Sequence, residues 1–416
     1  MSTTTAPPAN TVGINQKTVR SVATETGSSP VQLVPGTTLA RALYETMTGR
    51  RVTLIDSAPG AGKSTLIVDL ARWVGAHMDL RLTIATPTRS AAITIAEKIA
   101  DADDRVSVVL ALSGYENPTR RSITAPGHGA FQGENGDIVV RTMASLGMDT
   151  KTSCDLLVVD EAYQSTFAQL MAAGKSSEQV LLVGDPGQIG PVTTADTTVF
   201  DGRDYPPHMR APDALRGHPS AVILHLDKTY RLGAESVRAI APLYDFAFGS
   251  GRPDRRIEGH REIESQKVAS DDPLKLYEKV SSIAASFIGK TLVESSGTRR
   301  LRPSDIAVVA GDNLSVNAIS GFLSSAGHFP GITVGTADRL QGGQWHAVVA
   351  LDPLAAAATV SEHHLSAGRL CVMASRQMSH LTWVHDGKWD GHISAFETEE
   401  PKEPLLEVRR RLTGSR

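Results

Sequence analysis

The chain has 416 residues, with 42 Lys and Arg against 45 Asp and Glu, and a formal net charge of −3. Hydrophobic residues make up 41% of it and charged residues 21%, which is typical of globular proteins and excludes wholesale disorder. No apolar run approaches the roughly 20 residues that a membrane-spanning helix needs, and Met1–Ala6 lacks the basic and apolar segments of a secretory signal. We therefore expect a cytoplasmic protein with no membrane partner and two or three domains.

The first half of the chain alternates short apolar runs with helical patterns. Residues 1–30 are rich in Ser, Thr, Pro and Ala and predict a flexible leader. Buried strands are predicted at Val52–Asp56, Leu82–Ala85, Val106–Leu110, Ile138–Val140, Leu156–Val159 and Val180–Val183. Helices are predicted between them, at Thr65–Val74 and Ser90–Ala100. This alternation is typical of a parallel sheet with helices on both faces.

The same rhythm returns in the second half. Its predicted strands are Val222–Leu226, Ile306–Val309, Ile332–Val334, Ala347–Leu351 and Leu381–Val384, and its predicted helices are Ala234–Phe248, Pro273–Ile288, Leu314–Ser325 and Ala367–Ser375. We therefore expect two α/β domains, residues 31–205 and 206–397, joined near Gly202–Pro219. Small insertions are expected at Ser113–Gly136 and Gly249–Pro303, and a flexible charged tail at 398–416.

A Gly-rich sequence follows the first predicted strand and opens a predicted helix, which is the setting of a phosphate-binding P-loop. Its glycines permit a tight turn whose N–H groups converge on a phosphate, and the helix N-terminus adds positive potential. Lys63 would reach the β- and γ-phosphates of ATP, and the Ser64 hydroxyl would bind Mg²⁺. Ser57 stands where the first glycine of the pattern is usual. The predicted ATP-binding residues are Pro59, Gly60, Ala61, Gly62, Lys63, Ser64 and Thr65.

A later strand ends in two adjacent carboxylates, Asp160 and Glu161. After a P-loop, a nucleotide-hydrolysing enzyme needs one acid to hold the metal and one to orient and deprotonate the attacking water. We assign Asp160 to the Mg²⁺ and Glu161 to the water.

Further motifs follow in a fixed order. They are Gly184-Asp185-Pro186-Gly187-Gln188-Ile189-Gly190-Pro191-Val192, then Thr229-Tyr230-Arg231, then the run from Val334 to Gln344, and then Val372-Met373-Ala374-Ser375-Arg376. Together with the P-loop and the acidic pair, this series resembles the motif set of the superfamily 1 helicases, in the form of the Upf-like and RecD-like branch. The resemblance covers about Val52 to Val384. It implies two tandem RecA-like P-loop domains, each a mainly parallel sheet flanked by helices, and an ATP hydrolase that depends on nucleic acid.

The resemblance also implies roles for single residues. Gln188 would bridge the γ-phosphate and the attacking water, and Arg231 and Arg376 would reach across the cleft from the second domain to the γ-phosphate. Gln344 stands where the family often has a glutamate that binds the ribose, so we expect it to contact the nucleotide as a neutral group.

The nucleic-acid contacts that the resemblance implies lie after predicted strands. Hydroxyls, amides and helix N-termini suit contacts to the backbone of a single strand, although any one of these threonines could equally be an ordinary helix cap. We favour DNA over RNA, and a protein partner subunit is possible. The predicted residues are Thr86, Pro87, Thr88, Arg89, Thr142, Thr336 and Gln341.

Two functions remain open from the sequence. One is an ATP-dependent helicase or translocase on single-stranded DNA or RNA. The other is a nucleic-acid-stimulated ATPase that remodels nucleoprotein complexes, in defence or in a mobile element, without unwinding. A P-loop kinase is disfavoured because it needs no pair of arginines across a cleft, and a degenerate motor is disfavoured because Lys63, Asp160, Glu161, Gln188 and both arginines are present.

Overall fold

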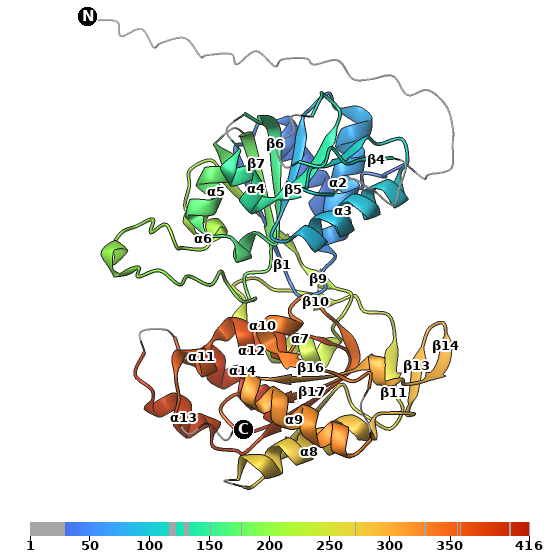
Figure 1. The fold of residues 1–416 in the computed structure, drawn as a ribbon, viewed down its shortest axis with the longest axis vertical. Helices are drawn as coiled ribbons and strands as arrows, with labels where there is room; N and C mark the ends of the chain where they lie inside the picture. Colours follow the sequence, from blue (N-terminus) through green and yellow to red (C-terminus); the bar gives the residue numbers. More distant parts are fainter. Residues whose placement is uncertain are drawn as a thin grey trace, which may run out of the picture.

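The computed structural model of the chain describes residues 30–415, apart from 116–121, 129–132, 150, 176, 271, 328–329, 356, 358 and 399–400. These residues form two lobes, one above the other in Figure 1. Within this part of the chain, no helix has the length and apolar character needed to cross a membrane. The predicted leader, except for residue 30, lies outside the described residues.

The first domain is built on a parallel sheet whose eight described strands run in the order β4-β3-β5-β2-β6-β7-β1-β8. Because helices cover both faces, the central strands are apolar along most of their length, and β1 and β6 are buried at every position. The strands are β1 (Val52–Ser57), β2 (Leu82–Thr86), β3 (Val108–Leu110), β4 (Ile123–Thr124), β5 (Ile138–Thr142), β6 (Cys154–Asp160), β7 (Ser177–Gly184) and β8 (Ala221–Leu226).

Two groups of helices sandwich this sheet. The layer on one face consists of α1 (Thr38–Met47), α2 (Lys63–His77) and α3 (Arg89–Ala102), whose apolar residues form one core with the strands. The opposite layer consists of α4 (Met143–Met148), α5 (Phe167–Gly174) and α6 (Ala211–Arg216), with a core of its own. Short 3-10 turns, η1 (Ala162–Gln164) and η2 (Thr198–Phe200), lie in the connections, and the loop that carries η2 projects to the left in Figure 1.

The structure moves the predicted domain boundary at 205/206. Val222–Leu226, predicted as a strand of the second domain, instead lies in β8, which pairs in parallel with β1 from Val52↔Ala221 to Ser57↔Leu226. The first domain therefore continues to residue 226. The alternation of strands and helices predicted this strand but could not say which sheet it joins, because either sheet has an edge whose N–H and C=O groups need a partner.

The second domain contains a parallel sheet whose five described strands run in the order β12-β18-β17-β15-β16. One face is covered mainly by α7, α10, α12 and α14, and the other by α8 and α9, so the expected fold class, two α/β domains with mainly parallel sheets flanked by helices, is confirmed. The strands are β12 (Ile263–Lys267), β15 (Ile306–Ala310), β16 (Thr333–Thr336), β17 (Trp345–Leu351) and β18 (Gln377–His385). The helices are α7 (Ala234–Ile240), α8 (Pro273–Ser286), α9 (Asn313–Ser325), α10 (Ala337–Leu340), α11 (Glu362–Leu365), α12 (Ala367–Met373), α13 (Trp389–Ala395) and α14 (Glu403–Thr413), with turns η3 (Ala241–Leu243) and η4 (Pro303–Asp305).

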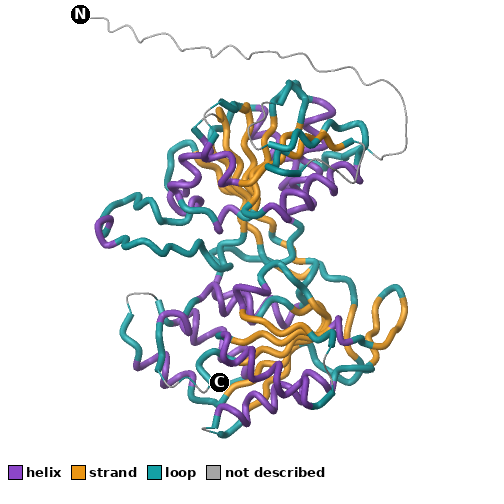
Figure 2. The backbone as a smooth tube through the Cα atoms, in the orientation of Figure 1, coloured by secondary structure: helices purple, strands orange, loops and turns teal. Residues whose placement is uncertain are grey.

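Two small sheets complete the described part of this domain. The strands β9 (Lys228–Thr229) and β10 (Gly249–Ser250) pair at the junction between the domains, and Figure 2 shows that this junction is made largely of loops. The strands β11 (Arg255–Ile257), β13 (Thr291–Glu294) and β14 (Gly297–Arg300) form an antiparallel sheet within the predicted insertion Gly249–Pro303.

The helix predicted at Ala234–Phe248 is shorter than expected. It ends at Ile240, and Pro242 lies in the turn that follows, because proline lacks the N–H that would continue the helix. Beyond it, the rings of Tyr244, Phe246 and Phe248 pack against one another with centroids 5.0–6.1 Å apart.

The predicted flexible tail over 398–416 is wrong for residues 403–413, which form α14. Leu405, Val408 and Leu412 are buried in the core of the second domain. Arg409 is also fully buried, and its Nε lies 3.0 Å from a carboxylate oxygen of Asp352 beyond the end of β17. The many charged residues of this segment favoured the prediction of a flexible tail. Its apolar residues, however, recur at spacings of three and four, which places them on one face of an amphipathic helix.

Candidate active site between the two domains

The loop between β1 and α2 has the backbone of a phosphate-binding turn. Gly60 has φ 74° and Gly62 φ 88°, in the left-handed region that glycine adopts without strain. Gly62 is the N-cap of α2 and provides no side-chain hydrogen bond, so the first N–H groups of the helix are left to bind another group. A free helix N-terminus of this kind attracts an anion.

Lys63 and Glu161 face each other across this loop, with Nζ 3.5 Å from Oε1. Glu161 has φ 50° and ψ 44°, and among the described residues it is the one non-glycine with positive φ. Such a conformation costs on the order of 1–3 kcal/mol and persists only where the surroundings impose it. The Glu161 N–H donates to Oδ1 of Asp160 over 3.0 Å, which helps to hold the turn. The strained turn places the Glu161 side chain in the cavity at the end of β6.

Asp160 is buried at the end of β6 without a direct ion pair among the described residues. Burial and then the neighbouring Glu161 raise the pKa of Asp160 to about 7, while Lys63 opposes the shift. Asp160 and the Ser64 hydroxyl line one cavity of about 580 Å³, which we call the α3 cavity because the start of α3 also lines it. A carboxylate and a hydroxyl are ligands that Mg²⁺ prefers, and a cation would relieve the destabilised charge of Asp160, so these residues fit that metal.

Gln188 links the two domains. Its Nε2 donates to Oδ2 of Asp185 over 2.8 Å, and its Oε1 accepts from Nε2 of Gln341, in the second domain, over 3.2 Å. The chains approach closely here, since a Cβ on Gly368 of α12 would lie 2.9 Å from the carbonyl oxygen of Gln188. Ile189, the next residue, is buried in the core of the second domain. The loop after β7 is therefore held by both domains.

Arg376 lies at the end of the segment between α12 and β18, and its side chain is buried. One Nη donates to the Ser375 hydroxyl over 3.0 Å, while Nε has no hydrogen-bond partner within the described residues. Burial lowers the pKa of Arg376. A buried guanidinium with an unused N–H is expensive unless an anion joins it, so this side chain fits a phosphate.

The residues predicted to hydrolyse ATP, apart from Asp160, meet in one cavity of about 260 Å³, here called the nucleotide cavity. It is lined by the P-loop residues Gly60 to Thr65 and by Glu161, Gln188, Arg231, Gly342 and Arg376. Pro59 contributes a backbone carbonyl just behind it.

Arg231 lines the nucleotide cavity from the segment that joins the two domains, and its contact with the γ-phosphate remains a prediction. The Tyr230 N–H donates to the carbonyl oxygen of Gly60 over 3.0 Å, and Arg231 packs so tightly on Gly60 that a Cβ there would lie 2.4 Å from its own Cβ. Its guanidinium donates to Gln344 Oε1 over 3.1 Å and to the Ser375 carbonyl over 3.2 Å. Arg231 thus lies on the joining segment with its backbone bound to the P-loop, whereas Gly342 and Arg376 line the cavity from the second domain proper. Burial and then Arg376 lower the pKa of Arg231 to about 9.

The P-loop region matches the model of a known protein family. A model of the family described as "AAA domain" matches residues 40–194.

Residues 40–194, which lie within the first domain, are thus similar to that family.

The chain as a whole is also similar to solved structures of viral helicases. One is described as "Crystal structure of Arterivirus nonstructural protein 10 (helicase)" (15% identity, TM-score 0.47, 83% of this chain and 62% of that one). A second is "The structure of PRRSV helicase" (14%, 0.44, 83% and 54%). A third is "Complex structure of Arterivirus nonstructural protein 10 (helicase) with DNA" (15%, 0.47, 86% and 65%). The chain therefore spans less than two thirds of the length of each.

Among the residues predicted to bind nucleic acid, some threonines have structural roles, and other residues line the α3 cavity or lie beside it. Thr86 is fully buried and donates to the carbonyl oxygen of Thr88, so it supports the turn and does not face a ligand. Thr88, Thr142 and Thr336 are N-caps of α3, α4 and α10, each accepting from a backbone N–H of the helix. Pro87, Thr88 and Gln341 line the α3 cavity, and Arg89 is exposed beside it.

Gln344 is exposed and engaged with Arg231, so the ribose contact predicted for it remains a prediction. Two site residues were missed by the sequence reasoning. Thr229 binds the P-loop from the joining segment, and Tyr244 binds Asp185 from the second domain. Thr229 had a signal, because it directly precedes Tyr230-Arg231, whereas nothing in the sequence near Tyr244 pointed to Asp185.

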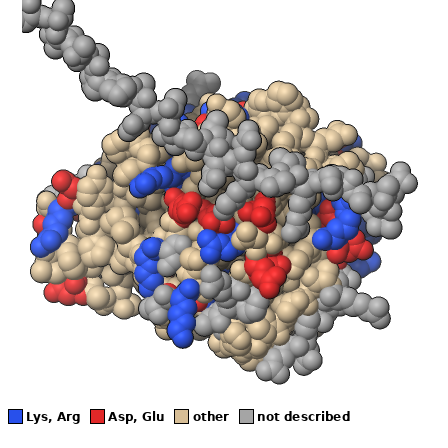
Figure 3. All heavy atoms as spheres, turned by 90° about the horizontal axis from the view of Figure 1, so that it is seen from above, with Lys and Arg blue, Asp and Glu red and all other residues tan. Residues whose placement is uncertain are grey.

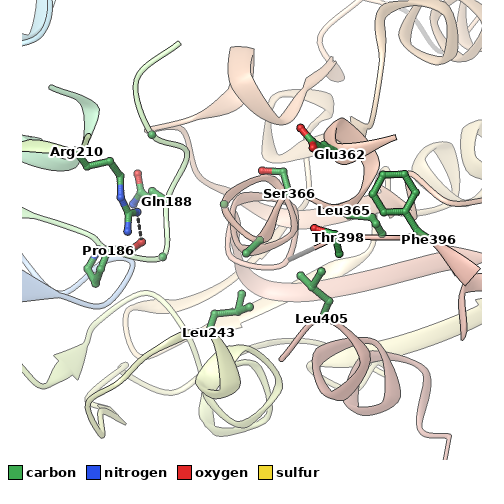
Figure 4. Close-up of a pocket in the computed structure, with 14 residues that line it drawn as sticks. Pro186, Gln188, Arg210, Leu243, Glu362, Leu365, Ser366, Phe396, Thr398 and Leu405 are labelled. Atoms are coloured by element: carbon green, nitrogen blue, oxygen red, sulfur yellow. Dashed lines mark hydrogen bonds between the residues drawn. The ribbon is translucent and has the colours of Figure 1, made fainter. Parts of the chain in front are cut away.

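A further cavity of about 580 Å³ lies between the loop after β7 and the helices of the second domain (Figure 4), and we call it the Phe396 cavity. Arg210 and Gln188 border it on the first domain, and Arg210 donates to the carbonyl oxygen of Pro186 over 2.8 Å. Apolar side chains of the second domain lie opposite, namely Leu243, Leu365, Phe396 and Leu405.

Proposed function

We propose that the chain is an ATP-dependent translocase or helicase, in which ATP hydrolysis between the domains drives movement along single-stranded DNA or RNA. One observation carries this proposal: side chains of both domains line the nucleotide cavity. Lys63 and Glu161 come from the first domain, and Arg376 comes from the second. A single-domain kinase or switch has no use for a guanidinium supplied from another domain.

The residues support a direct route to hydrolysis. Lys63 and the N–H groups at the start of α2 would bind the β- and γ-phosphates, and Lys63 would then exchange its present partner, Glu161, for phosphate. The released Glu161 carboxylate would accept a proton from the attacking water. Arg376 and Arg231 would stabilise the charge that develops on the γ-phosphate. Ser64 and Asp160 would hold Mg²⁺, which neutralises phosphate charge when bound.

The link between hydrolysis and movement runs through Gln188. Its amide is shared between Asp185 of the first domain and Gln341 of the second. A γ-phosphate would compete for the same amide, so occupation of the nucleotide cavity would change the contact between the domains. Repeated closing and opening would let the two domains hold the strand in turn.

The proposed strand would lie across the α3 cavity and the Phe396 cavity. Helix α3 begins at the α3 cavity, where the N–H groups of its first turn that Thr88 does not cap would favour a backbone phosphate without regard to sequence. Phe396 offers an aromatic ring for a base, and Arg210 a guanidinium for a phosphate. Figure 3 views the end of the first domain that lies away from the second domain. Its coloured part mixes acidic and basic side chains and so offers no uniformly basic surface.

Remodelling without unwinding is the second candidate, and the small insertions favour it. In the described part of Gly249–Pro303, the added structure amounts to α8 and the antiparallel sheet β11-β13-β14. The first insertion, Ser113–Gly136, contains β4, and part of it lies outside the described residues. Strand displacement on a tailed duplex separates the two candidates, because a translocase without a strand separator moves but does not unwind.

The first test is steady-state ATP hydrolysis with and without single-stranded DNA or RNA. We expect strong stimulation by nucleic acid, and we expect Glu161→Gln to abolish turnover while leaving ATP bound. Lys63→Ala should abolish turnover by removing the charge that binds phosphate, so unchanged turnover in that variant would refute the P-loop assignment. Robust hydrolysis that neither nucleic acid stimulates would contradict the motor and leave a protein-remodelling ATPase.

A further inference from the structure

The hydroxyl of Thr229 uses its full hydrogen-bonding capacity inside the protein. It donates to the carbonyl oxygen of Pro59 over 2.6 Å, and it accepts from the N–H groups of Arg231 and Leu232, each over 3.2 Å. One donor and two acceptor sites are all that a hydroxyl has. Thr229 is fully buried, so no water replaces these bonds.

These bonds join the P-loop to the segment that carries Arg231. Thr229 binds Pro59 through its side chain, and the next residue, Tyr230, donates its N–H to Gly60 over 3.0 Å. Gly60 has no space for a Cβ, because Arg231 Cβ would lie 2.4 Å and Thr229 Oγ1 3.2 Å from it. The backbone of Arg231 is therefore fixed to the phosphate-binding turn at a distance set by Thr229.

We propose that Thr229 is a positioning residue for ATP hydrolysis, which holds Arg231 in register with the P-loop while the second domain moves. This inference rests on the proposed hydrolysis and adds a division of labour to it. Arg231 stays with the phosphate-binding turn throughout the cycle, and Arg376 alone arrives with the second domain. The bonds of the Arg231 guanidinium to Gln344 and Ser375 are then the ones that change when the domains open or close.

The test compares Thr229→Val, which keeps the shape and removes the hydroxyl, with Thr229→Ser, which keeps the hydroxyl. A misplaced catalytic group costs on the order of 10²-fold in rate, so we expect kcat of Thr229→Val to fall by about 10- to 100-fold with little change in KM for ATP. Thr229→Ser should restore most of the rate. Thr46→Val is the matched control, since Thr46 is also buried and donates to a backbone carbonyl, that of Ala42 over 3.0 Å, on α1.

A double-mutant cycle separates positioning from general structural support. If Thr229 acts through Arg231, Thr229→Val should reduce kcat little further in an Arg231→Ala background. The full reduction in that background would overturn the proposal, as would a Thr229→Val enzyme with wild-type kcat. If Thr229→Val does not fold, Thr229→Ala takes its place in the same double-mutant cycle, because alanine removes the same hydrogen bonds and is smaller.

A binding measurement keeps this inference apart from the proposed function. ADP with fluoroaluminate and Mg²⁺ mimics the transferring phosphoryl group, and its affinity relative to ADP reports the arginines without turnover. Thr229→Val should lose this preference to about the extent that Arg231→Ala does. If the wild-type chain bound ADP with and without fluoroaluminate but hydrolysed no ATP, the proposed function would fail. A weaker preference for fluoroaluminate in Thr229→Val would then still support the positioning of Arg231 by Thr229. Equal preference in wild type and Thr229→Val would overturn it.

Discussion

The hydroxyl of Tyr244, in the second domain, donates a hydrogen bond to Oδ1 of Asp185, in the first, over 2.9 Å. Asp185 is buried and accepts two more bonds from its own loop, from the Gly187 N–H over 3.0 Å and from Gln188 Nε2 over 2.8 Å. Tyr244 also packs against Gly187 so closely that a Cβ there would lie 2.4 Å from the hydroxyl oxygen. The Asp185 carboxylate thus joins the second domain to Gln188, which we expect to bridge the γ-phosphate and the attacking water.

Tyr244→Phe should slow hydrolysis without weakening ATP binding. A hydrogen bond to a charged group is worth about 1.5–3 kcal/mol, which corresponds to about a tenfold or larger loss of kcat if Gln188 becomes misaligned. Burial already raises the pKa of Asp185, and the Tyr244 bond lowers it, so the variant should shift the acidic limb of the kcat–pH profile to higher pH. Tyr277→Phe on α8 is the control, because the Tyr277 hydroxyl accepts a hydrogen bond from the Ser315 hydroxyl over 3.2 Å within the second domain. An unshifted profile with normal kcat would contradict the coupling.

Arg376→Gln should lose hydrolysis and gain stability. Arginines that contact the γ-phosphate contribute on the order of 10³–10⁵ in rate, so turnover should fall by at least that lower factor. Among the described residues the Arg376 guanidinium has no ion pair and its buried Nε has no hydrogen-bond partner, so removing this charge should raise the melting temperature of the nucleotide-free protein. Calorimetry without nucleotide checks this, with exposed Arg261→Gln as the control. A marked loss of stability would mean that Arg376 is structural.

Asp160→Asn should change the pH dependence of stability in the nucleotide-free protein. The folded pKa of Asp160, about 7, lies above the value of 3.8 for a free side chain. The folded state therefore binds the extra proton between about pH 4 and 7, and stability is lost as the pH rises through that window. The asparagine variant lacks this loss, so it should melt above wild type at pH 8 and close to it at pH 4. Equal melting-temperature differences at both pH values would show that Asp160 is not protonated near neutral pH.

The same raised pKa predicts proton release when metal binds. Mg²⁺ requires the ionised carboxylate, so metal binding at pH 6 should be weaker than at pH 8 and should release a proton. Calorimetric titration of the wild-type protein with Mg²⁺ and ATP in buffers of different ionisation enthalpy measures the protons released. Zero protons released at pH 6 would contradict the assignment.

Arg409→Met should destabilise the second domain. Arg409 and Asp352 are both fully buried and bonded over 3.0 Å, and removing one partner of a buried pair typically costs about 3–5 kcal/mol. The double variant Arg409→Met/Asp352→Asn should recover part of the loss, because no buried carboxylate is then left alone. Urea unfolding of the three proteins measures both effects. A single variant as stable as wild type would show that α14 does not hold β17.

The sequence by itself determined the features that depend on residues close together in the chain. Apolar runs predicted the strands, and the glycine spacing from Gly60 to Lys63 predicted the phosphate-binding turn, because φ above zero and a free helix N-terminus follow from local chemistry. The acidic pair at the end of β6 was predicted because a P-loop hydrolase needs a metal ligand and a base, and Gln188 was implied by the resemblance to the helicase motifs. The contact between Gln188 and Gln341 was not.

Only the tertiary structure decided the pairings between distant segments. It placed β8 beside β1, docked α14 through Arg409, bound Arg231 to the P-loop through Thr229, and set Tyr244 against Asp185. Each pairing joins residues that lie 57 to 170 positions apart, and many segments of similar chemistry could have taken the same place. The choice among them depends on which partner buries the apolar face and satisfies every enclosed N–H and carboxylate at once, and a local pattern carries no information about that.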